Sequence, residues 1–111
     1  MNFAQPKDTD IQAVKAANPG KKLRMLTSHS ASVIVRAPSE AEFARMQVML
    51  ADGGQGKRLA ASNQLLRDVA VWPDAAAVRD IITELPGVSL TFLDDILDLM
   101  GIGGAVEKKD L

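Results

Sequence analysis

Three groups of residues carry side chains that could do chemistry. The first is Ser28-His29-Ser30, where hydroxyl groups flank the only imidazole of the chain. A nucleophile beside a base suggests hydrolysis, but adjacent turn residues point in different directions, and a triad also needs an orienting acid and an oxyanion site. Turn formation explains this segment better. We therefore expect no catalytic residue, and we expect that the protein is not an enzyme.

The second group is Asp94, Asp95 and Asp98, whose spacing places them on one face of a helix. Together they could attract a divalent cation. A hard metal ion requires further oxygen ligands from a loop or a second element, and the sequence offers no candidate. The exposed face of an amphipathic helix explains all three aspartates, so no metal site is expected.

The third group is the run Gly-Gly-Gln-Gly-Lys-Arg at residues 53–58, which is similar to a phosphate-binding loop. The P-loop pattern requires G-x-x-x-x-G-K-[ST] at the end of a strand. Here the run follows a helical pattern, and Arg58 stands where the hydroxyl residue should be. We interpret the run as a flexible connection between helices, and no cofactor is expected.

The elements that must position these residues predict an α+β fold, with an N-terminal β-hairpin followed by about four short helices. A leading helix over residues 8–17 should end at Asn18-Pro19-Gly20, which favours a turn. Lys21–Thr27 and Ala31–Ala37 are typical of two strands, the second being β-branched and apolar. Residues 28–30 are then the hairpin connection.

Local signals also predict where the four helices begin and end. Ser39 and Glu42 form a capping-box pattern at the start of the first, and three glycines between residues 53 and 56 end it. The second runs from about Lys57 and stops before Trp72-Pro73, and Asp74 caps the third. The fourth spans about Ser89–Met100. We expect one domain over residues 1–101, with residues 1–20 as a leading helix that can be loosely attached, and a flexible tail over 102–111.

Composition restricts the class of protein. The chain has 111 residues, of which 47% are hydrophobic and 24% are charged, and it has no cysteine. It therefore has no disulfides, which fits a reducing cytosol. No stretch approaches the ~18 consecutive apolar residues that a membrane span needs. We expect a cytoplasmic protein without a signal peptide or a membrane anchor.

Three short helices with a Trp-Pro corner raise the question of DNA binding. A DNA-reading motif should contain a basic recognition helix. The last three predicted helices are acidic overall, and Arg67 and Arg79 each stand beside an aspartate. Nucleic-acid binding is therefore the weaker hypothesis.

Apolar helix faces are the remaining functional feature. Several of them carry methionines, whose unbranched side chains repack easily against varied partners. The alternative is that these methionines simply fill a small core that has few aromatic residues. The candidate partner-binding residues are Phe43, Met46, Met49, Phe92, Leu93, Ile96 and Met100.

The order of signals over residues 33–101 resembles the tail assembly chaperones of long-tailed bacteriophages. A strand runs into Arg-Ala-Pro-Ser-Glu-Ala-Glu-Phe at residues 36–43, and a helix holding Leu66 and Asp68 follows. The chain then reads Val-Ala-Val-Trp-Pro-Asp at 69–74 and Leu-Pro-Gly at 85–87, before a final amphipathic helix and a glycine.

This resemblance implies a helper protein of the host cytoplasm that is absent from the mature virion. Its partners would be the long helical tape measure protein and the tail tube protein, and a homo-oligomer is left open. Two alternatives remain, namely a structural or adaptor subunit that stays in the virion and a small nucleic-acid-binding regulator.

Overall fold

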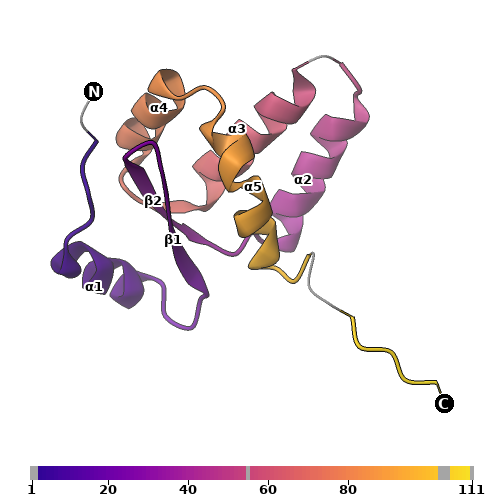
Figure 1. Ribbon diagram of the computed structural model, residues 1–111, viewed down its shortest axis with the longest axis horizontal. Helices are drawn as coiled ribbons and strands as arrows, with labels where there is room; N and C mark the ends of the chain where they lie inside the picture. Colours follow the sequence, from indigo (N-terminus) through magenta and orange to yellow (C-terminus); the bar gives the residue numbers. More distant parts are fainter. Residues whose placement is uncertain (1–2, 55, 103–105, 111) are drawn as a thin grey trace.

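The computed structural model describes residues 3–54, 56–102 and 106–110, and Figure 1 shows how its helices and strands are arranged. The predicted α+β class is confirmed, as is a hairpin followed by four helices. The predicted leading helix is also present. In chain order the elements are α1 (Asp8–Ala17), β1 (Leu23–Ser28), β2 (Ala31–Arg36), α2 (Glu40–Ala51), α3 (Lys57–Val69), β3 (Ala70–Trp72), α4 (Ala75–Glu84) and α5 (Val88–Asp98).

The hairpin of β1 and β2 is closed by a loop of two residues. The strands pair antiparallel from Leu23↔Arg36 to Ser28↔Ala31. His29 and Ser30 make the loop, with φ angles of 50° and 65°. Two-residue turns of type I′ use left-handed backbone at both positions, because this conformation follows the twist of the strands. The predicted connection is thus confirmed, although neither loop residue is the glycine or asparagine that such a turn favours.

Strand β3 was not predicted. The sequence suggested a helix running almost to Trp72, whereas α3 ends at Val69 and the next three residues pair antiparallel with β2. The pairs are Ile34↔Trp72 and Val35↔Ala70, with an irregular register between them. A strand of three residues is too short to show a period of two, so only the proximity of β2 specifies it.

The core lies between the sheet and the helices that follow it. Strand β2 is the middle strand, and all residues from Ala31 to Val35 are buried. In Figure 1, α2, α3 and α5 lie on one side of the hairpin and α1 on the other. The helices contribute Met46, Ala61, Leu65, Leu66, Val69, Val78, Ile81, Val88, Phe92, Leu93 and Ile96 to the core.

Helix α1 contacts the opposite side of the hairpin through a small apolar area. Val14 is its only buried residue. Together with Ile11 it borders a hollow of about 110 Å³ whose other apolar lining residues are Leu23, Met25 and Ile34. The loose attachment of residues 1–20 stays a prediction. So does the flexibility of 102–111, where residues 106–110 are exposed and form no helix or strand, and 103–105 and 111 lie outside the described residues.

The predicted helix signals are present as hydrogen bonds. The Glu42 amide donates to the Ser39 hydroxyl at 3.2 Å, and the Ser39 amide donates to the Glu42 carboxylate at 2.9 Å. Asp74 caps α4 by accepting from the Ala77 amide at 2.9 Å. After α5, Gly101 has a φ of 93°, the left-handed conformation that commonly follows a helix. These signals mark the starts of α2 and α4 and the end of α5.

One ion pair joins three elements of the fold. The two terminal nitrogens of Arg36, at the end of β2, donate to the two carboxylate oxygens of Glu42 at 2.7 Å each. The same guanidinium donates to the Asp68 carbonyl near the end of α3 at 2.9 Å. Hydrogen bonds from Arg36, and then the one from the Ser39 amide, lower the pKa of Glu42 to about 2 against the opposing effect of burial.

The first prediction concerns how Glu42 affects the stability of the fold at low pH. Its pKa is lower in the folded chain than the ordinary value of 4.5, so the unfolded chain takes up the proton first as the pH falls. The ion pair's stabilisation is therefore complete above about pH 5 and is lost as the pH falls through 4.5 towards 2. Because the side chain is only 14% exposed, the shift corresponds to about 3 kcal/mol. We expect Glu42→Gln to lower the free energy of unfolding at pH 7 by about 2–3 kcal/mol.

Urea unfolding followed by circular dichroism at pH 7, 4 and 3 measures this effect. Glu42→Gln should also flatten the loss of stability between pH 5 and 3. The matched control is Glu40→Gln, an exposed residue of the same helical turn, which should change stability by less than about 0.5 kcal/mol. An unchanged acid dependence in Glu42→Gln would contradict this account.

The second expected outcome concerns the hairpin loop. Left-handed backbone costs a residue with a side chain roughly 1–2 kcal/mol, and less for asparagine. We expect the double change His29→Asn with Ser30→Gly to raise the free energy of unfolding by about 1 kcal/mol. The contrasting variant Ser30→Val should lower it, because a β-branched residue resists this conformation. Equal thermal midpoints for both variants would show that the turn is not under strain.

Candidate docking groove

An apolar groove lies between α2, α3 and α5. Helices α2 and α3 are joined by the glycine-rich turn, in which Gly53 and Gly56 have φ angles of 69° and 80°. The turn reverses the chain, so the two helices pack side by side, and α5 packs against α3. The groove has a volume of about 220 Å³ and is lined by Met46, Gln47, Leu50, Arg58, Ser62, Leu93, Asp94 and Leu97.

The floor and the walls of the groove differ in exposure. Met46, Ser62 and Leu93 are buried and form its floor. Leu50 on the α2 wall is 37% exposed, and Leu97 on the α5 wall is half-buried. The volume corresponds to several water molecules at ~30 Å³ each. Replacing water beside these leucines with an apolar side chain would favour binding.

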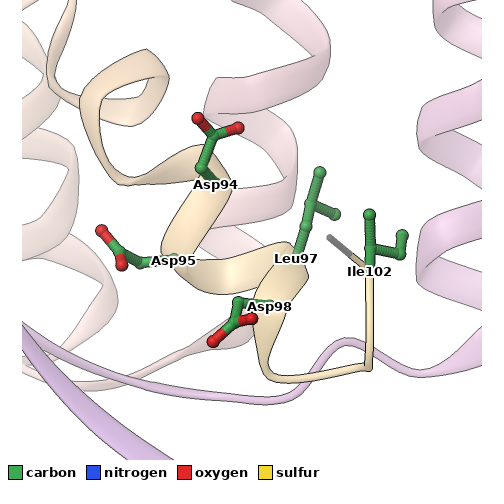
Figure 2. A pocket seen from close by; sticks show the side chains of 5 residues that line it. All are labelled: Asp94, Asp95, Leu97, Asp98 and Ile102. Carbon is green, nitrogen blue, oxygen red and sulfur yellow. The ribbon is translucent and has the colours of Figure 1, made fainter. Parts of the chain in front are cut away.

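A second, open hollow continues over the outer side of α5. Figure 2 shows its lining residues, Asp94, Asp95, Leu97, Asp98 and Ile102. It shares Asp94 and Leu97 with the groove. The three carboxylates point in different directions in Figure 2, and within the described residues no group of side chains could hold a metal ion.

The position of Ile102 follows from the end of α5. Its amide donates to the Leu97 carbonyl at 3.3 Å, and the Gly101 amide donates to the Asp98 carbonyl at 3.0 Å. These two bonds are those of a Schellman motif, which turns the chain back beside the last helical turn. Ile102 therefore lies near Leu97 and remains 41% exposed.

One arginine approaches the carboxylates of α5 from the sheet. Arg24 of β1 lies 3.2 Å from an Asp98 oxygen and 3.9 Å from an Asp95 oxygen. It also donates to the Asp95 carbonyl at 3.1 Å. These side chains are 37–58% exposed, so the pairs contribute little to stability. They connect β1 to the outer side of α5.

Four of the seven predicted partner-binding residues are buried in the folded monomer. The buried ones are Met46, Phe92, Leu93 and Ile96. They fill the core, which is the alternative that the sequence left open, because α5 turns its wide apolar arc towards α3 and the sheet. Met46 and Leu93 still reach the groove as its floor.

The other three predicted residues are half-buried. Phe43 and Met49 pack against the core from α2, and Met100 follows α5. None of the three lines the groove. Whether any of the seven residues binds a partner stays a prediction.

Sequence reasoning missed the groove walls. Leu50 and Leu97 belong to the apolar faces of their helices, but at the margins of those faces, where helical spacing alone does not separate buried from open positions. Arg58 and Asp94 were interpreted only as loop and solvent-facing charges. The available signal was a leucine at the edge of an apolar stripe together with a charged residue. On α5 these are Leu97 and Asp94, and on α2 and α3 they are Leu50 and Arg58.

The other candidate chemistry finds no support in the geometry. His29 lies exposed in the hairpin loop. The glycine-rich run connects α2 to α3 rather than a strand to a helix, and its Gln55 lies outside the described residues. Across the described part of the chain, every helix is too short or too polar to cross a bilayer.

Searches of protein-family models, curated proteins and solved structures found no match to this chain. The surface that could bind a partner is therefore the basis for a functional proposal. Of the surfaces described, the groove combines a partly exposed leucine on α2, a half-buried leucine on α5, a mostly apolar floor and charged residues of both signs.

Proposed function

We propose that this protein is a tail assembly chaperone of a long-tailed bacteriophage. In this role it binds the tape measure protein in the host cytoplasm, brings tail tube subunits to it, and is not retained in the virion. The observation that carries the proposal is the groove between α2, α3 and α5, where Leu50 is 37% exposed and Leu97 is half-buried beside a mostly apolar floor. The resemblance over residues 33–101 supports the same role.

The groove suits a client that exposes apolar helix faces. An amphipathic helix can lay one or two apolar side chains of its stripe into such a groove while its polar side stays in water. An unassembled tape measure protein would present long stripes of this kind, which otherwise lead to aggregation. Many copies of a small domain can cover such a stripe.

The small size of the groove favours reversible binding. Burial of apolar surface contributes about 25 cal/mol per Å², and binding must first offset the lost freedom of two molecules. A shallow groove of about 220 Å³ therefore gives modest affinity at each site. Modest affinity allows tail tube subunits to replace the chaperone as the tail grows.

The third expected outcome is rescue of client solubility. Co-expression with the tape measure protein should increase the client's soluble fraction, and Leu50→Ser should reduce this effect. Because Leu50 is already 37% exposed, the loss of its contact should weaken binding by about fivefold. The soluble fraction in the lysate and the affinity of purified proteins are the measurements.

Val48→Ser is the matched control. Val48 also lies on α2 and is 66% exposed, but it does not line the groove. It should leave client solubility unchanged. Equal loss in both variants would reject the groove as the binding surface, and a wild-type chain that never improves client solubility would reject the proposed function. Presence of the chain in purified mature tails would favour a structural subunit instead.

A further inference from the structure

The lining of the groove carries charges of both signs. Asp94 lines the groove on the α5 side, and Asp95 and Asp98 continue this wall around the outside of the helix. Arg58, from the first turn of α3, is the other charged residue among the groove's described lining. A partner seated in the groove would therefore meet the carboxylates of α5 and the positive charge of Arg58.

We propose that the groove binds a helix whose apolar stripe is flanked on one side by Lys or Arg, with this basic flank against α5. The inference rests on the proposed function and specifies the kind of client segment that this groove selects. A tape measure protein contains many apolar stripes, and this charge pattern would select among them.

The charge balance of the α5 wall supports a basic flank. Among the carboxylates of the described residues, Arg24 lies within 4.0 Å of Asp95 and Asp98 only, so one cation stands against two carboxylates. Among the described residues, no ion pair within 4.0 Å includes Asp94. The wall therefore keeps a net negative charge at the point where it borders the groove.

The construction of the groove favours a helix over an extended segment. Its lining residues all come from the helices α2, α3 and α5, and none comes from a strand. An extended peptide gains most of its affinity from unpaired backbone groups at a sheet edge. The groove has no such edge, so recognition depends on side chains, and a helix presents these at i, i+3 and i+4.

The apolar and charged contacts have different roles. Exposed ion pairs are weak individually and are screened by salt. Charges arranged along a wall nevertheless steer a partner and set its orientation. The leucines therefore supply most of the affinity, and the aspartates select the partner.

Two synthetic amphipathic peptides test this inference. Both have the same leucine stripe, and one flank carries Lys in the first peptide and Glu in the second. Fluorescence anisotropy with the full chain should show about fivefold tighter binding of the Lys peptide at low ionic strength. The preference should disappear at about 1 M salt, where the Debye length is ~3 Å.

Reversing the charge of Asp94 tests whether the α5 wall selects the Lys peptide. Asp94→Lys should remove the preference for the Lys peptide or invert it, and its exposed position makes the change compatible with folding. The control is Asp80→Lys, which makes the same charge change at an exposed site on α4 away from the groove. It should leave the preference intact.

Equal affinity for the two peptides, or equal effects of Asp94→Lys and Asp80→Lys, would overturn the inference. So would the absence of binding by both peptides. These outcomes are separate from the solubility test, because a chain that still keeps the client soluble after such a result remains a chaperone that uses another surface.

Discussion

The bidentate pair of Arg36 and Glu42 is the contact on which the arrangement of the helices depends. It joins the last residue of β2 to the first turn of α2, and its third bond reaches the Asp68 carbonyl of α3. Arg45 of α2 extends the same network to the Asp68 carboxylate at 3.3 Å. Planar two-bond pairing fixes direction as well as distance. These polar contacts therefore join α2 and α3 at the ends of the two helices that lie away from the glycine-rich turn.

The packing of apolar side chains around the middle strand β2 explains why the groove between the helices stays uncovered. Helix α3 packs against β2, helix α5 packs against β1, and α1 approaches β2 from the other side, so the β2 residues from Ala31 to Val35 are all buried. Most of the available apolar surface is used around this strand. Helices α2 and α3 meet the turn between them at the margin of the molecule in Figure 1, and Leu50, which comes just before this turn, remains 37% exposed.

Local signals in the sequence predicted most of the fold. The capping box at Ser39, the cap at Asp74 and the glycine-rich break act between neighbouring residues, so they can be interpreted without a structure. Strand β3 could not be found in this way, because three residues become a strand only through pairing with β2. The left-handed loop at His29 was likewise hidden, since neither residue is a usual one for that turn.

The candidate site was harder to predict for a geometric reason. Helical spacing shows which face of α5 is apolar, but Phe92 and Ile96 at its centre are the residues that packing buries first. The open positions are those at the border of the face, such as Leu97. A binding surface on a small helical domain is therefore better sought where an apolar stripe meets charged residues than at the centre of the stripe.

The charged border of the groove bears on two requirements. The groove must offer its leucines to a partner, and the domain must not pair with copies of itself. A domain with exposed leucines in a hollow risks pairing with its own copies. Carboxylates along one wall oppose a contact in which two such walls face each other, because like charges would then be brought together. A basic helix suffers no such repulsion. The aspartates of α5 would thus disfavour this mode of self-association and favour a basic partner through a single property, the sign of their charge.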